Sequence, residues 1–435
     1  MKTIRRPERD IPVIAETQVL VVGSGPAGIA AAVAAARTGA KTMLAEKYGC
    51  FGGALSVGQV ESYNWYFNDK TYTSCGISSE IEQRMIAMGG TQHDDRGIGN
   101  FLNAEIYKIM LDRWVEEEGI TPLLHALAVD VVKDGDKVRG VIFESKSGCG
   151  AVLADCVIDA TGDGDVAALA DAQYHIGGTD ARDVLPVTMV FGVSGVDVKT
   201  FRDYVQAHKE MITPETHGLK KVFLLAQQAG KWPYSCEGGA WKTLTPSGDF
   251  TSLNITREFG IDGTNVWDLT RAEISGRKQA LQAIECMREF GAEMGLANCT
   301  LRSFGYQIGI RETRRILCEY NMTRADIMGK AEFEDNIGVY TRFIDGEVIS
   351  HDDSRFQLPY RMIVPVKIDN LLVAGRCAGC EKDAVQTIRM MVCCAATGQA
   401  AGTAAALSAI QGIAPRNLSV ACLQEKLRAD RMILA

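Results

Sequence analysis

Val19-Leu-Val-Val-Gly-Ser-Gly-Pro-Ala-Gly28 is the stretch that decides the fold of this chain. Four strand-forming residues lead into a turn with three glycines, and an alanine-rich segment at 27–38 follows them. Gly23 permits a sharp turn, Gly25 lets a pyrophosphate approach the backbone, and Gly28 lets the following helix pack closely. The pattern predicts a strand, a tight turn and a helix, which form the first half of a dinucleotide-binding βαβ unit.

A second apolar run, Lys41-Thr-Met-Leu-Ala-Glu46, completes this unit with an acid. A carboxylate at the end of the second strand accepts hydrogen bonds from both hydroxyls of an adenosine ribose and disfavours a 2′-phosphate. The free amides at the start of the helix, with its positive dipole end, suit a pyrophosphate. The unit therefore predicts FAD or NAD rather than NADP, without deciding between the two.

The composition indicates a globular protein of two or three units. At one domain per ~150 residues, 435 residues with a 46% hydrophobic share are too many for one core. The net charge of −8 and the absence of a basic stripe argue against a nucleic-acid partner. We see no signal peptide and no membrane span, and the thirteen scattered cysteines are typical of reduced thiols. We therefore expect a cytoplasmic location.

Two later strand ends extend the predicted parallel sheet. Ala154–Asp165 contains a buried strand that ends in Thr-Gly-Asp and opens a helix, and Asp369–Arg376 is another buried strand that ends at a glycine. Before them, strand signals on both sides of the turn Asp134–Lys137 predict a small antiparallel β-meander. Since nucleotide-binding parts occur at both ends of the chain, the pattern favours FAD, whose length requires several distant segments to hold it.

The middle of the chain has a different pattern. Strand signals such as Val187–Val193 alternate with helical signals around 201–207 and 269–290. We therefore expect an α+β substrate domain inserted into an α/β FAD-binding domain. The expected divisions are a lead-in at 1–17, a first FAD-binding part with the meander at 18–180, the substrate domain at 181–360 and a second FAD-binding part at 361–435.

The first glycine motif and five further motifs, in order along the chain, resemble the FAD-dependent oxidoreductases of the FAD_oxidored group, relatives of the fumarate reductase and succinate dehydrogenase flavoproteins. The resemblance covers about residues 19–406. Besides the first glycine motif, it rests on Phe51–Gly53, Ile158–Asp163, Ile308–Arg315, Asn370–Cys377 and Gly398–Gly402. It implies a glutathione-reductase-like FAD/NAD(P)-binding fold of the Rossmann type with the substrate domain inserted.

The resemblance also implies cofactor contacts at particular positions. It implies a pyrophosphate site at Gly23, Ser24, Gly25, Pro26, Ala27 and Gly28. It implies an adenosine site at Glu46, Lys47, Ala128, Ala160, Thr161, Gly162 and Asp163. It implies contacts with the ribityl chain and its surroundings from Gly52, Gly53, Ala54, Gly375 and Arg376. Finally, it implies a helix that opens toward the flavin N1 and O2 edge at Gly398, Gln399, Ala400 and Ala401.

The chain departs from some relatives in two places. Gly49–Gly53 contains no histidine, so a histidyl-FAD bond is not supported and we expect non-covalent FAD. Where the fumarate reductases have Gly-Glu at a strand end, this chain has Gly375-Arg376, and we do not transfer the fumarate reaction. No second complete glycine triplet followed by an acid marks a domain for direct docking of NAD(P)H, so the electron donor or acceptor stays open.

Arginines are the expected substrate ligands. Arg311, Arg314 and Arg315 fall in one predicted helical segment, where Arg311 and Arg315 share a face and could bind a carboxylate. Bracing of the domain by ion pairs is the favoured alternative for this triplet. Arg389 is the better single candidate for the active site, with a pyrophosphate or structural contact as its alternative. His351, next to two aspartates, is a candidate proton donor or a structural histidine.

Cys377-Ala-Gly-Cys380 follows the strand end expected beside the flavin. The pair could be a redox-active dithiol, could join Cys393 and Cys394 in a metal or iron–sulfur site, or could be small buried side chains. A second C-x2-C is absent and adjacent cysteines point apart, so burial is favoured and no metal site is expected.

These observations predict an FAD-dependent oxidoreductase. We expect hydride transfer at flavin N5 with a small polar metabolite that carries a carboxylate. Two other classes stay open: a non-redox flavoenzyme, such as an isomerase or hydro-lyase, and an electron-relay subunit that uses Cys377 and Cys380. The expected partners are a small-molecule substrate and an unidentified electron donor or acceptor, with a homo-oligomer possible.

Overall fold

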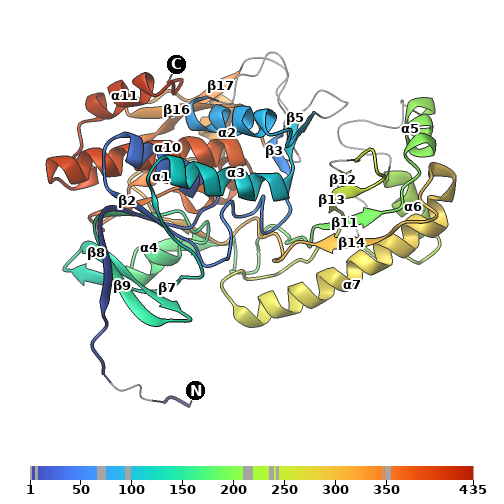
Figure 1. The fold of residues 1–435 in the computed structure, drawn as a ribbon, viewed down its shortest axis with the longest axis horizontal. Helices are drawn as coiled ribbons and strands as arrows, with labels where there is room; N and C mark the ends of the chain where they lie inside the picture. Colours follow the sequence, from blue (N-terminus) through green and yellow to red (C-terminus); the bar gives the residue numbers. More distant parts are fainter. Residues whose placement is uncertain are drawn as a thin grey trace.

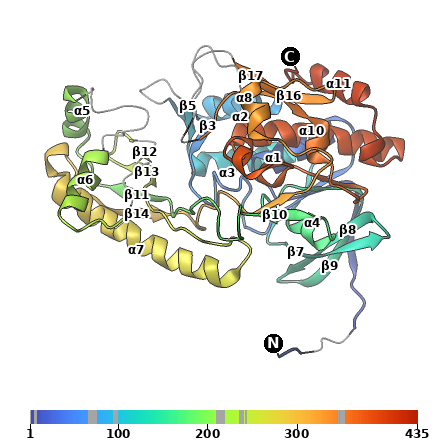
Figure 2. The same ribbon diagram turned by 180° about the vertical axis from the view of Figure 1, so that it is seen from behind.

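The structure, a computed structural model, has two parts that lie side by side (Figures 1 and 2). The larger part contains both ends of the chain, and the smaller part contains the middle. The structure describes residues 2–4, 8–65, 75–93, 99–208, 219–234, 240–241, 244–345, 347 and 354–434.

A seven-stranded sheet forms the centre of the larger part, in the order β6-β2-β1-β9-β8-β7 with β18 also beside β9. Its parallel strands are β1 (Val13–Val22), β2 (Thr42–Ala45), β6 (Thr121–Leu123), β9 (Gly148–Asp159) and β18 (Leu371–Val373). The antiparallel meander adds β7 (Leu127–Asp134) and β8 (Lys137–Ser145). The parallel core between helices confirms the α/β, Rossmann-type fold. The expected lead-in at 1–17 is too long, because β1 already begins at Val13.

Helices α1 (Pro26–Arg37) and α10 (Met391–Gln411) pack against each other over the sheet (Figure 1). A Cβ on Gly398 would lie 2.1 Å from the Ala27 carbonyl oxygen, and one on Gly402 would lie 2.0 Å from that of Ala31. Only glycine allows this approach. The two ends of the chain therefore meet in one core.

The remaining elements of the larger part surround this core. The helices are α2 (Gly76–Ala87), α3 (Ala104–Glu117), α4 (Asp165–Leu169), α8 (Arg324–Gly329), α9 (Val385–Ile388) and α11 (Val420–Ala429). The smaller sheets are β3 (Ser62–Trp65), β5 (Gly99–Leu102) and β4 (Thr91–His93), and the pair β16 (Asn336–Thr341) and β17 (Arg355–Pro359). The side chain of Asn103 caps α3 by accepting hydrogen bonds from the amides of Glu105 and Ile106.

The smaller part is a four-stranded sheet with helices. It contains β11 (Phe191–Ser194), β12 (Ala240–Trp241), β13 (Phe250–Asn254), β14 (Thr300–Phe304), α5 (Val198–Ala207), α6 (Lys220–Gln228) and α7 (Val266–Phe290). It has its own apolar cluster, which includes Phe191, Phe250 and Met287. The strands β10 (Tyr174–Ile176) and β15 (Arg314–Ile316) pair antiparallel.

The structure differs from the expected division at residue 360. Apolar side chains such as Met322, Ile337 and Phe356 belong to the core of the larger part, together with α1 and α10. The chain therefore returns to the larger part well before residue 360, because β16 and β17 bury their apolar faces there.

In the part of the chain that the structure describes, no single helix has both the length and the apolar composition of a membrane span. The segments Lys382–Ile388 and Met391–Gln411 reach this length and apolar composition only when they are taken together, and the chain bends by 88° between them.

Candidate functional site

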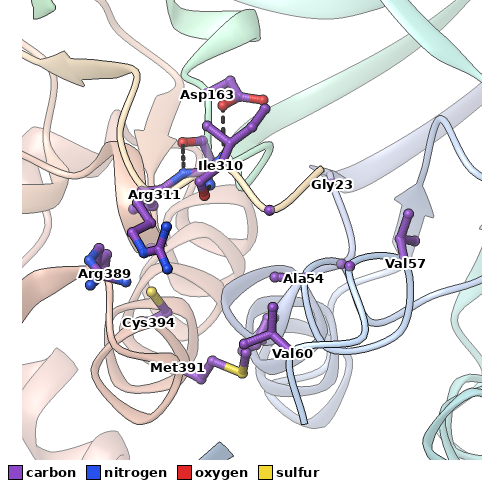
Figure 3. A pocket seen from close by; sticks show the side chains of 18 of the residues that line it. Gly23, Ala54, Val57, Val60, Asp163, Ile310, Arg311, Arg389, Met391 and Cys394 are labelled. Carbon is purple, nitrogen blue, oxygen red and sulfur yellow. Dashed lines mark hydrogen bonds and ion pairs between the residues drawn. The ribbon is translucent and has the colours of Figure 1, made fainter. Parts of the chain in front are cut away.

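One cavity of about 730 Å³ runs from the carboxyl ends of β1, β2 and β9 to the junction with the smaller part. Figure 3 shows its lining near the start of α10. Most of the predicted cofactor positions line this cavity: Gly23, Ser24, Gly25, Pro26, Ala27, Glu46, Lys47, Gly53, Ala54, Ala128, Ala160, Thr161, Gly162, Asp163, Gly375 and Arg376. The predicted positions outside the lining are Gly28, Gly52, Gly398, Gln399, Ala400 and Ala401.

The three glycines of the first motif have different steric surroundings. Gly23 has a φ of +93°, and a Cβ there would lie 2.5 Å from the Ala160 carbonyl oxygen. A Cβ on Gly28 would lie 1.8 Å from the Gly23 carbonyl oxygen. A Cβ on Gly25 would meet no protein atom within 4 Å, although Gly25 lines the cavity. The first and third glycines therefore serve the fold, and the second leaves open the space beside the start of α1 that suits a pyrophosphate.

Glu46 directly follows β2, and hydrogen bonds with the glycine turn hold its side chain in place. Its Oε2 accepts hydrogen bonds from Ser24 N at 2.9 Å and Ser24 Oγ at 2.6 Å, and its Oε1 accepts one from Tyr48 N at 3.2 Å. The carboxylate is 5% exposed, so these contacts orient it before any ligand arrives. Burial opposes the charge of the neighbouring Lys47, but negative groups led by Asp163 outweigh this effect and raise its pKa.

Arg376 contacts protein oxygens from two different segments. Nε donates to Gly162 O at 2.8 Å, Nη2 donates to Asp163 Oδ1 at 2.7 Å, and Nη1 donates to Ile310 O. Each of its three guanidinium nitrogens thus donates to a protein oxygen, although Arg376 also lines the cavity. These hydrogen bonds brace the two segments, and the implied contact of Arg376 with the phosphate or ribityl region of FAD stays a prediction.

The predicted helix opening at Gly398 is wrong, because α10 begins at Met391 and Gly398 lies inside it. Gln399 Oε1 accepts a hydrogen bond from Ile77 N at 2.8 Å, and Gln399 is 1% exposed, so it contacts α2 instead of the cavity. Met390, Met391 and Cys394 at the true start of the helix line the cavity (Figure 3). No glycine or capping side chain marks the start of α10 in the sequence. The glycine motif at Gly398, seven residues later, therefore gives a false signal for the start of this helix.

Arg311 lies at the end of the cavity near the smaller part. It donates to Thr188 Oγ1 at 2.7 Å, to Asn254 Oδ1 at 3.2 Å and to the Pro186 carbonyl oxygen. All three acceptors are neutral. Burial and the positive charges of neighbouring arginines lower the pKa of Arg311, which means that its charge is poorly compensated.

Arg389 follows α9 and lines the same region of the cavity. It donates to Asp345 Oδ2 and, at 3.3 Å, to Gln386 Oε1, whereas its buried Nε has no partner among the described residues. Figure 3 shows Arg311 and Arg389 directed toward the space near Cys394 at the start of α10. Two guanidinium groups therefore converge where the cavity is also lined by the N-terminus of a long helix, an arrangement that favours an anion.

Arg314 and Arg315 do not share this position. The predicted helix is wrong, since 311–313 are irregular and β15 begins at Arg314. Arg315 is buried, pairs with Glu312 and donates to Gly177 O at 2.7 Å, and it does not line the cavity. These contacts correspond to the bracing interpretation, and Arg315 is corrected from a catalytic to a structural candidate.

Arg257 is a cavity residue that the sequence did not reveal. It donates to Asn254 Oδ1 at 2.8 Å and to Thr188 Oγ1 at 3.1 Å, the same two acceptors that Arg311 uses. It follows β13, and the isolated bridges Val187–Glu258 and Thr188–Gly309 bring it to the segment of Arg311. No local pattern in the sequence could have found it.

The remaining candidates lie elsewhere. His351 falls outside the described residues. Cys377 and Cys380 are buried and unpaired, do not line the cavity, and have pKa values raised by burial, to about 12 for Cys380. Within the described ranges, no group of three or more histidine, cysteine, aspartate or glutamate residues could hold a metal ion. The burial interpretation of these cysteines therefore has the support of the structure.

The comparisons with known proteins cover different shares of the chain. The model of a family described as FAD dependent oxidoreductase matches residues 18–427. Digeranylgeranylglycerophospholipid reductase from Picrophilus torridus is 28% identical over 155 residues, which are 33% of this chain and 38% of that protein, so less than two thirds of that relative is matched.

Two solved structures resemble this chain with low TM-scores. A geranylgeranyl bacteriochlorophyll reductase-like protein from Thermoplasma acidophilum is 15% identical, with coverage of 95% of this chain and 83% of that chain and a TM-score of 0.44. A flavocytochrome c3 fumarate reductase is 14% identical, with coverage of 92% and 79% and a TM-score of 0.37. These two structures carry no functional argument.

Proposed function

The chain belongs to the FAD-dependent oxidoreductase family, in agreement with its six motifs, and we propose that it oxidises or reduces a small carboxylated metabolite on non-covalently bound FAD. The observation that carries this proposal is the continuity of one cavity. The same cavity contains the glycine turn at Gly25, the start of α10, and the two arginines Arg311 and Arg389. A cofactor site and an anion site are thus adjacent.

The residues present fit FAD from one end to the other. Gly25 and the start of α1 would receive the pyrophosphate, Glu46 would accept hydrogen bonds from the adenosine ribose, and Gly53 would lie along the ribityl chain. The amides at the start of α10, from Met391 onward, would stabilise negative charge at the edge of the flavin ring. When bound, FAD supplies hydride transfer, which no side chain of the protein can perform. We propose non-covalent binding because Gly49–Gly53 contains no histidine for a histidyl-FAD bond.

The substrate would be oriented by its carboxylate. Arg311 is held by neutral oxygens and has poorly compensated charge, so an arriving carboxylate gains charge-assisted hydrogen bonds without first displacing an internal acid. Arg389 is paired with Asp345 and retains a free Nε toward the same region. A planar guanidinium can bind both oxygens of a carboxylate, which fixes the direction of the attached carbon atom. Arg257 would help to orient Arg311, because both side chains donate to Thr188 Oγ1 and Asn254 Oδ1.

Anaerobic reduction of the purified flavoprotein tests this proposal. Small hydroxy, amino and unsaturated acids are mixed with the oxidised or dithionite-reduced protein, and the visible flavin absorbance is followed. Bleaching by a carboxylated donor, or recovery of colour with a carboxylated acceptor, supports the proposal. Turnover without net bleaching would favour a non-redox flavoenzyme, and bleaching that requires a second protein would favour an electron relay. Either of these two results contradicts the proposed reaction.

We propose a cytoplasmic location from the state of the cysteines. All twelve cysteines that the structure describes are unpaired, which supports a reducing compartment such as the cytoplasm. We retain the division into a split FAD-binding domain and an inserted substrate domain, with the return to the larger part placed before residue 322.

A further inference from the structure

A buried hydrogen-bond network connects the loop after β9 with the segment that carries Arg311. Asp163 lies at its centre, because its Oδ1 accepts from Arg376 Nη2 at 2.7 Å and from Thr313 Oγ1 at 2.9 Å. Asp163 is 7% exposed and Thr313 is 1% exposed. Asp163 and Thr313 are thus largely shielded from bulk water, and loss of the Thr313 hydroxyl removes one of the two hydrogen bonds that Asp163 Oδ1 accepts.

Arg376 connects the same two segments through their backbones. It donates to Gly162 O, in the loop predicted to contact the cofactor, and to Ile310 O, directly before Arg311. Thr313, which lies two residues after Arg311 in the chain, is attached to Asp163 through its hydroxyl. The backbone on both sides of Arg311 is therefore fastened to the cofactor side of the cavity, and Figure 3 shows the contacts of Asp163 and Ile310 with this network.

These attachments matter because Arg311 lies on irregular backbone. Residues 311–313 belong to no helix or strand, so no ladder of backbone hydrogen bonds fixes them. The guanidinium of Arg311 is held from the other side, by Thr188 and Asn254 near the smaller part. The side chain of Arg311 is therefore held by Thr188 and Asn254, whereas the backbone around it is held by the network at Asp163 and Arg376.

We propose that Thr313, Asp163 and Arg376 form a positioning network that sets the distance between the Arg311 guanidinium and the cofactor. This proposal rests on the proposed function, since it concerns the anion site of that cavity. Asp163 and Arg376 line the cavity and could also affect the cofactor directly. Thr313 does not line it, so a change at Thr313 acts on a ligand only through the network.

Binding of oxalate to the FAD-loaded protein tests the network. Oxalate serves as a small anionic probe, and its affinity is measured from the change in flavin absorbance that it causes. Thr313→Val removes the hydroxyl and keeps the shape, whereas Thr313→Ser keeps the hydroxyl. Thr341→Val is the matched control, because Thr341 is 3% exposed and its hydroxyl has no hydrogen-bond partner among the described residues.

We expect Thr313→Val to weaken oxalate binding about tenfold, which corresponds to ~1.4 kcal/mol, with an unchanged FAD content. Thr313→Ser and Thr341→Val are expected to bind oxalate within about twofold of the wild type. Wild-type oxalate affinity in Thr313→Val would overturn the proposal, and so would loss of FAD from that variant. If Thr313→Val does not fold, Thr313→Ala replaces it under the same criteria.

The failure of the proposed function has a different signature. If the wild-type protein binds no FAD, or if Arg311→Gln binds oxalate as well as the wild type does, the cavity is not the anion-binding flavin site described above. If FAD binds and oxalate binding depends on Arg311 but not on the Thr313 hydroxyl, only the positioning network is refuted.

Discussion

Substitution of Gly25 separates the role of the glycine turn in cofactor binding from its role in folding. Gly25 has a φ of −62°, which any residue can adopt, and a Cβ there would meet no protein atom within 4 Å. Gly25→Ala is therefore expected to leave the unfolding free energy of the apoprotein unchanged or to raise it by about 0.4–1 kcal/mol, because alanine restricts the unfolded chain. The added methyl group occupies the space proposed for the pyrophosphate.

The effect on FAD follows from this geometry. Forcing a methyl group into a close contact costs about 1–3 kcal/mol, which predicts FAD binding weaker by roughly 5- to 150-fold for Gly25→Ala. Gly25→Val adds two further methyl groups and is expected to abolish retention of FAD during purification. The dissociation constant is measured by titrating the apoprotein with FAD and following the quenching of flavin fluorescence, and stability is measured by thermal unfolding without FAD.

Two other glycines provide the controls. Gly28→Ala is expected to prevent folding, because its Cβ would lie 1.8 Å from a carbonyl oxygen. Gly329, at the end of α8, has open space around a Cβ and lies outside the cavity, so Gly329→Ala is expected to keep both stability and FAD affinity. Wild-type FAD affinity in Gly25→Ala and Gly25→Val, with both proteins folded, would refute the pyrophosphate assignment.

Three further predictions concern the rest of the site. Arg311→Gln should weaken the binding of carboxylates about 10- to 150-fold, the loss of a charged hydrogen bond of ~1.5–3 kcal/mol, while FAD content is unchanged; a loss of FAD instead would place Arg311 in the cofactor site. Gly398→Ala should lower the unfolding free energy by about 3 kcal/mol or more, because its Cβ would lie 2.1 Å from Ala27 O; an unchanged thermal midpoint would refute the helix contact. Because burial raises the pKa of the Cys377 and Cys380 thiols, alkylation of the native protein near pH 8 with peptide mass analysis should leave both unmodified; rapid labelling of either would restore the dithiol alternative.

The geometry of the glycine turn is predictable from the sequence because its signals are local. Gly23 and Gly28 determine one turn through short contacts, Gly25 leaves open space beside it, and Glu46 follows at the end of the next strand, so a short window of sequence contains these signals. The close packing of α1 and α10 likewise leaves a glycine signature at Gly398. That signature has two possible causes, a helix start or a helix contact, and only the structure distinguishes them.

The substrate half was less predictable because it depends on tertiary pairing. Arg257 and Arg311 share acceptors from two other segments of the chain, and no spacing in the sequence predicts that meeting. The cluster around Arg315 was mistaken for a helix, although Arg315 lies in a short strand whose partner is β10. Helical spacing over five residues is too short a pattern to exclude a strand when charged side chains are used for internal ion pairs.

The most direct test of the central claim is the visible absorbance spectrum of the purified protein after reconstitution with FAD and removal of unbound cofactor. We predict one FAD per chain, released by denaturation without any covalent remainder on the polypeptide. A folded wild-type protein that retains no flavin after this procedure would contradict the account at its foundation, because the glycine turn, Glu46 and the start of α10 would then have no common ligand.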